Sequence, residues 1–114
     1  APPLSSPSEC AGRANEWNPT PLRVVLRVPV QHEDLRQAEV AVWVPDHVRV
    51  AFDANEYSSG QLLLIPVHMT ESGEWQGALR WRALRAGRFD AWVETRWAGG
   101  LYQHRPVIFN AVNP

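Results

Sequence analysis

Hydrophobic and polar residues alternate along most of the chain from Leu22 onward. In segment 22–30 aliphatic residues occupy every second position, with Arg23 and Arg27 between them. The same period of two returns in 39–45, 47–52, 74–83, 89–97 and 104–112. This pattern is typical of strands with one face buried and one exposed. The run QLLLIPV at 61–67 is apolar on both sides, which predicts a strand buried on both faces.

These seven segments are separated by turn-forming residues, and no convincing helical segment of about ten residues appears. We therefore predict an all-β fold, an immunoglobulin-like β-sandwich of about seven antiparallel strands spanning residues 22–114. A small barrel is the alternative. The segment 32–37 is expected to be a polar connection. Residues 1–21 hold five of the ten prolines and are expected to form an extended leader or linker, with 1–15 held by weak contacts.

The charge balance limits the classes of partner. Eleven basic residues, all Arg, face twelve acidic ones, and no basic block occurs. Nucleic acid and anionic membrane surfaces need a clustered positive footprint, so neither is expected as the main partner. No apolar run approaches transmembrane length. The chain starts at Ala1 without a signal peptide, so we expect a mature secreted or periplasmic protein, or part of a larger cytoplasmic enzyme.

Catalytic and metal-binding patterns are poor. Asp46 and His47 are adjacent and fall on opposite faces of a strand, no serine lies in a nucleophile elbow, and the carboxylates are scattered. The four histidines (32, 47, 68 and 104) are widely separated, and Cys10 and Met69 lie at the wrong positions for a copper site. We expect a non-catalytic protein without a metal or cofactor.

Tryptophan supplies the best functional candidate. Six Trp in 114 residues indicate a large aromatic core or exposed aromatic platforms. Alternate residues of a strand point to opposite faces of the sheet. This alternation predicts that Trp75, Trp81, Phe89 and Trp97 are buried, whereas Trp92 points outward. The short loop 84–88 suggests that the strands on either side of it pair as a hairpin. The resulting candidate ligand-binding face, with Trp43 added by its own parity, consists of Trp92, Trp43, Arg80, Arg82, Asp90, Glu94 and Arg96.

This face has three interpretations. Sugars stack on indole rings while their hydroxyls bond to Asp, Glu, Gln and Arg, which favours a polysaccharide ligand. Trp and Arg also dominate protein interfaces, so a neighbouring protein domain is the competing partner. Alternatively, Trp92 is only shielded by long side chains or by the leader.

The segment GEWQGALRWRALRAGRFDAWVETRW, residues 73–97, resembles the immunoglobulin-like, early-set domains that accompany α-glucan enzymes. The similarity lies in Trp75 closing a turn, a short loop containing Gly87, and Phe89 and Val93 in the following strand. The resemblance implies a β-sandwich that packs on a catalytic domain, supports assembly, or binds polysaccharide. We therefore expect a non-catalytic accessory domain of a carbohydrate-active protein, with a protein–protein interaction or assembly module as the alternative.

Overall fold

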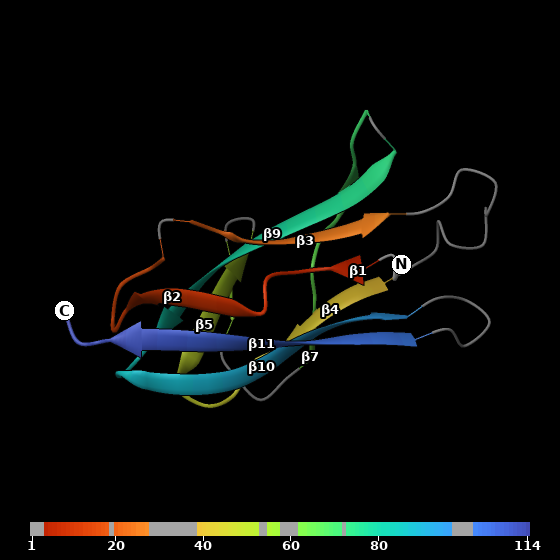
Figure 1. Cartoon of the computed structure of the whole chain (residues 1–114). Coiled ribbons are helices and arrows are strands. Elements are labelled where there is room, and N and C mark those ends of the chain that lie inside the picture. Colours follow the sequence, from red (N-terminus) through yellow and green to blue (C-terminus); the bar gives the residue numbers. More distant parts are fainter. Residues whose placement is uncertain are drawn as a thin grey trace.

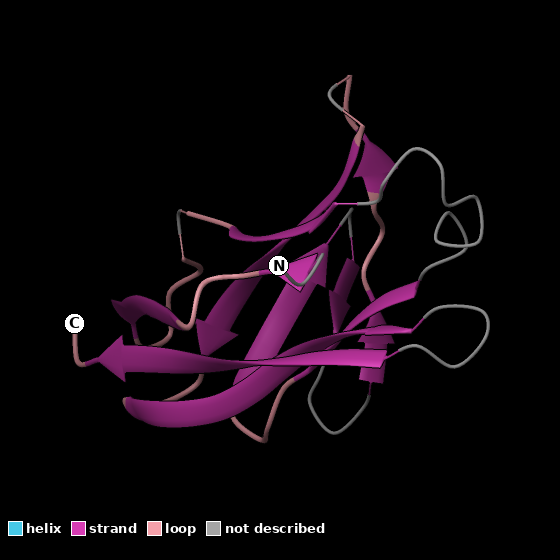
Figure 2. Cartoon of the chain, turned by 45° about the vertical axis from the view of Figure 1, so that its right-hand side comes forward, coloured by secondary structure: helices cyan, strands magenta, loops and turns pink. Residues whose placement is uncertain are grey.

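The protein folds as an all-β sandwich of two facing sheets. The computed structural model describes residues 4–18, 20–27, 39–52, 55–57, 62–71, 73–96 and 102–114. Within these residues the regular structure consists of eleven strands, and Figure 1 shows how they form two layers. The same view turned by 45° shows strands and loops without a helix in the described parts (Figure 2). The predicted polar connection 32–37 lies outside the described residues.

The first sheet has the strand order β1-β3-β9-β5-β6, with β8 also paired to β9. Its strands are β1 (Leu4–Ser5), β3 (Leu22–Arg27), β9 (Glu74–Ala83), β5 (Val48–Phe52), β6 (Asn55–Tyr57) and β8 (His68–Met69). The second sheet has the order β2-β11-β10-β4-β7. Its strands are β2 (Glu9–Arg13), β11 (Tyr102–Val112), β10 (Gly87–Arg96), β4 (Glu39–Trp43) and β7 (Leu62–Leu64).

This strand order is that of an immunoglobulin sandwich. Labelled A to G along the chain, β1, β3, β4, β5, β9, β10 and β11 give the sheet A-B-E-D facing the sheet G-F-C. The immunoglobulin-like fold is therefore confirmed. One pairing departs from the prediction of antiparallel strands, because β2 runs parallel to β11.

The core lies between the sheets and follows the predicted parity. The inward residues of β3, Leu22, Val24 and Leu26, are buried. In β9 and β10 the predicted core residues Trp81 and Phe89 are buried as well. Trp75 is half-buried and packs against the core, and Trp97 lies outside the described residues. Alternation along β3, β9 and β10 therefore identified the inward face of these strands correctly.

The described N-terminal residues are part of the sandwich, so the expectation of a weakly held leader is wrong for them. Leu4 is 1% exposed and joins the core from β1, which pairs with β3. β2 pairs with β11, and beyond it the Ala14 N–H donates to the Val112 carbonyl oxygen at 2.8 Å. The composition suggested disorder, but extended backbone suits an outer strand and needs only a few apolar residues to be retained.

The predicted hairpin around 84–88 is also wrong. β9 pairs with β3, β5 and β8, whereas β10 pairs with β11 and β4 in the other sheet. The connection therefore crosses the sandwich, as expected between strands E and F of an immunoglobulin fold. The Leu84 N–H donates to the His47 carbonyl oxygen at 2.6 Å, which keeps the end of β9 beside β5. The alternation of apolar and polar residues predicts which face of the sheet each side chain lies on. It does not predict which strands pair with each other.

Within segment 61–67, the described residues 62–67 are exposed on one face, so the prediction that both faces are buried is wrong. β7 is the last strand of its sheet, with Leu63 buried and Leu62 and Leu64 exposed. The chain then crosses to β8 in the first sheet, passing close to Gly77. A Cβ atom at Gly77 would lie 2.9 Å from the Pro66 carbonyl oxygen, so this crossing requires glycine.

Candidate functional site

The outer face of the second sheet carries a stacked pair of tryptophans. Trp92 of β10 lies directly opposite Trp43 of β4, so both side chains project from the same face. Their ring centroids are 4.3 Å apart and their planes differ by 11°. Both side chains are half-buried. The pair therefore presents one rigid aromatic area, which two separate indoles would not provide.

Glu94 holds the Trp92 indole in place. Its carboxylate accepts a hydrogen bond from the Trp92 Nε1–H at 3.0 Å and another from the Arg96 Nε–H at 2.9 Å. Its side chain is 4% exposed, whereas that of Arg96 is 57% exposed. A buried carboxylate is tolerated when its oxygens are hydrogen-bonded and a positive charge lies beside it. Both oxygens of Glu94 are thus already bonded within the protein.

The pair is flanked by β11 on one side. Pro106 lies opposite Trp92 and is exposed, and the His104 ring contacts the Trp92 ring with centroids 5.3 Å apart. On this side the indole is therefore bordered by one apolar ring and one imidazole.

On the other side the pair is continuous with β7. Leu62 lies opposite Trp43, and Leu64 lies opposite the buried Ala41. Leu62 is 38% exposed and Leu64 is 57% exposed. We call Trp43, Trp92, Leu62 and Leu64 the Trp–Leu surface. It extends from the third strand of the sheet, β10, to the open edge at β7.

The structure separates the predicted ligand-binding residues into two groups. Trp92, Trp43, Asp90, Glu94 and Arg96 share the outer face of the second sheet, and Asp90 is exposed there. Arg80 and Arg82 lie on β9 in the first sheet. The prediction of one shared face for all of these residues is therefore wrong, because it depended on the hairpin.

Arg80 and Arg82 instead lie over the ring of Trp17. The guanidinium carbons of Arg80 and Arg82 lie 5.5 and 5.2 Å from the ring centroid of Trp17. The Asn18 N–H donates to the Trp81 carbonyl oxygen at 3.0 Å, which places the segment carrying Trp17 beside β9. These arginines therefore cover a tryptophan of the segment predicted to be a leader.

Two features of the site were missed at the sequence level. The apolar run predicts Leu62 and Leu64 in the core, although Pro66 shortly after them is a signal for a strand at the sheet edge. The burial of Glu94 had no sequence signal, because its immediate neighbours along the chain suggest an ordinary outward carboxylate.

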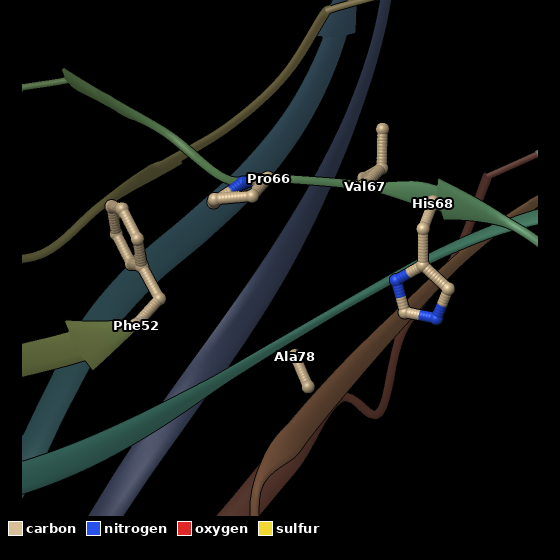
Figure 3. Close-up of a pocket in the computed structure, with 5 residues that line it drawn as sticks. All are labelled: Phe52, Pro66, Val67, His68 and Ala78. Atoms are coloured by element: carbon tan, nitrogen blue, oxygen red, sulfur yellow. The ribbon is translucent and has the colours of Figure 1, made fainter. Parts of the chain in front are cut away.

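A cavity lies beside strands β5, β8 and β9 of the first sheet. Its volume is about 240 Å³. The residues that line it are Phe52 of β5, Ala78 of β9, His68 of β8 and the preceding Pro66 and Val67 (Figure 3). Its lining is apolar apart from one imidazole. No cluster of three His, Cys, Asp or Glu that could hold a metal ion occurs in the described residues. Across the same parts of the chain, no helix has the length and apolarity of a membrane span.

Comparisons with known proteins were made for the whole chain. A scan against protein-family models and a search of curated proteins find no match. Among solved structures, the chain is similar to the ASH / PapD-like domain of human CEP192 (PapD-like domain 7). The TM-score is 0.48 at 7% sequence identity, and the match covers 98% of this chain and 87% of that chain. The immunoglobulin-like fold of this chain follows from its own strand order.

Proposed function

We propose that this protein is a non-catalytic protein-interaction or assembly domain whose partner docks on the Trp–Leu surface. The observation that carries the proposal is the continuity of the stacked Trp43–Trp92 pair with the exposed Leu62 and Leu64. Contiguous exposed apolar side chains on a small domain favour association, and tryptophan is enriched where interfaces gain most of their binding energy. The proposal assigns no catalytic residue and no cofactor.

A protein partner fits this surface better than a sugar does. A glycan platform needs free hydrogen-bonding groups around the indole. Both oxygens of Glu94 are engaged by Trp92 and Arg96, and Arg80 and Arg82 lie on the other sheet. The immediate neighbours of the pair are mainly apolar, with leucine on one side and proline beside the His104 ring on the other, which suits the apolar core of a protein interface. The accessory role in a carbohydrate-active protein stays a prediction without support from the comparisons.

Affinity capture with variants of the surface tests this function. The full chain is immobilised and captured proteins are quantified by mass spectrometry for wild type, Trp92→Ala and Leu64→Lys. Val112→Lys is the matched control, because Val112 is 55% exposed and lies at the end of β11. We expect specific partners to be lost by about tenfold or more in the two surface variants and retained in the control.

Two results would contradict the proposal. One is capture that is equal for all four proteins while circular dichroism shows that they are folded. The other is binding on a glycan array that Trp92→Ala abolishes, because that result would return the surface to a polysaccharide ligand.

A further inference from the structure

The edge of β7 that faces away from β4 pairs with no other described strand, and its backbone groups can pair with an added strand. The Ile65 N–H donates to the Val40 carbonyl oxygen at 2.8 Å, so Ile65 turns its backbone toward β4. Backbone groups of successive strand residues point to alternate sides, so Leu63 also faces β4, whereas Leu62 and Leu64 face away from it. Among the described strands, β7 pairs only with β4. Two N–H groups and two carbonyl groups therefore point outward at this edge.

Apart from its short length, the β7 edge lacks the usual protections against pairing within the described part of the chain. Natural sheets guard exposed edge strands with charged side chains, proline or bulges. β7 is Leu62–Leu64, without a charge, and Pro66 comes only where the chain has left for the first sheet. The strand at the opposite edge, β2, provides a contrast, since it carries the exposed charged residues Glu9 and Arg13. An unprotected edge beside an apolar surface favours addition of a strand.

The sequence of β7 is complementary to itself. Read antiparallel to a second copy, Leu62 lies opposite Leu64 of the other chain, and Leu63 lies opposite its own equivalent. The outward backbone groups then form four N–H to carbonyl hydrogen bonds, with an apolar pair at every position and no like charges opposed. A register displaced toward Pro66 would lose donors, because proline has no N–H.

We propose that this chain forms a homodimer by antiparallel pairing of β7 with β7 of a second copy, about a two-fold axis at Leu63. This inference rests on the proposed function and names the partner at the edge. A two-fold axis is the symmetry of most homodimers, and with it the same surface patch of each subunit forms the interface. In the dimer the second sheets of both copies join, and each Leu64 is covered by Leu62 of the other copy. Because the edge is short, the dimer is reversible and depends on protein concentration.

Sedimentation velocity over a wide concentration range tests the dimer. The wild-type mass should rise from 12.9 kDa toward twice that value as concentration increases. Leu64→Lys places a charge on the edge, and Leu64→Pro removes an outward N–H without breaking a bond to β4, so both should stay monomeric. Val112→Lys should dimerise like the wild type. Circular dichroism of each variant verifies the fold.

The outcomes separate this inference from the proposed function. A wild-type chain that stays monomeric at every concentration overturns the homodimer, as does a dimer that persists in both Leu64 variants. If the monomeric chain still captures proteins that Leu64→Lys releases, only the self-pairing fails. If the monomeric chain captures no protein that depends on Leu64 or Trp92, the homodimer and the proposed function fail together.

Discussion

Removal of the Glu94 carboxylate should destabilise the domain and release the Trp92 indole. Glu94→Ala deletes the acceptor of two hydrogen bonds, from Trp92 at 3.0 Å and from Arg96 at 2.9 Å. A hydrogen bond to a charged group contributes about 1.5–3 kcal/mol. The Arg96 side chain is 57% exposed and can turn to water, so its share is at most about 1 kcal/mol. Together with the lost packing of a buried side chain, we expect a loss of about 2–4 kcal/mol in the free energy of unfolding.

Glu94→Gln separates charge from shape. The amide retains an acceptor for the Trp92 N–H but loses the ion pair with Arg96, so the expected loss is about 1 kcal/mol. Asp90→Ala is the control, because Asp90 is an exposed carboxylate on the same face of β10 and should change stability by no more than about 0.5 kcal/mol. Urea denaturation followed by fluorescence measures the free energy of unfolding of all three variants. The m-value should be the same as for the wild type.

Near-ultraviolet circular dichroism supplies a second readout. The stacked rings of Trp43 and Trp92 are 4.3 Å apart, so their signal should weaken in Glu94→Ala and persist in Glu94→Gln. If Glu94→Ala is as stable as the wild type and keeps the aromatic signal, the carboxylate does not position the indole. That result would mean that the free-energy cost of burying the Glu94 carboxylate equals the free energy that its hydrogen bonds contribute.

Three further predictions follow from the fold. Leu4→Ala should lower the free energy of unfolding by about 2–5 kcal/mol in urea denaturation, because this side chain is buried. A loss below about 0.5 kcal/mol would support the expectation that the N-terminal segment is only weakly held. Gly77→Ala should lower the unfolding free energy by about 1–3 kcal/mol, because its Cβ would meet a backbone oxygen at 2.9 Å; an unchanged midpoint would show that the crossing adapts freely. Burial, and to a smaller extent the neighbouring Glu9 carboxylate, raises the pKa of the Cys10 thiol above its ordinary value, so iodoacetamide should react more slowly than with the unfolded chain at the same pH. Glu9→Gln should lower that pKa and speed the reaction, and an equal rate in wild type and variant would exclude the charge effect.

The faces of the strands could be predicted from the sequence, because each depends only on local alternation. Parity placed Trp81 and Phe89 in the core, and it placed Trp43 and Trp92 outside. The immunoglobulin-like fold followed from the number and spacing of such strands. This part of the prediction is robust because a strand with the wrong face inward would bury charges.

The partners of the strands could not be predicted, since pairing depends on the whole topology. The loop 84–86 is short enough for a hairpin, yet it joins the two sheets. Arg80 and Arg82 consequently left the predicted site, while Trp43 met Trp92 through the pairing of β4 with β10. Likewise, an apolar run such as that of β7 has the same sequence pattern in a buried strand and in an edge strand.

Amide hydrogen exchange at β7 tests the central claim most directly, because it reports whether a partner occupies the edge. In dilute protein the outward amides of Leu62 and Leu64 should exchange quickly, and those of Leu63 and Ile65, which face β4, should exchange slowly. When the chain is concentrated or a captured partner is added, the Leu62 and Leu64 amides should become protected and the signals of Trp43 and Trp92 should shift. Protection that develops elsewhere, while the Leu62 and Leu64 amides still exchange quickly and the Trp43 and Trp92 signals do not change, would contradict the claim that partners bind at the Trp–Leu surface.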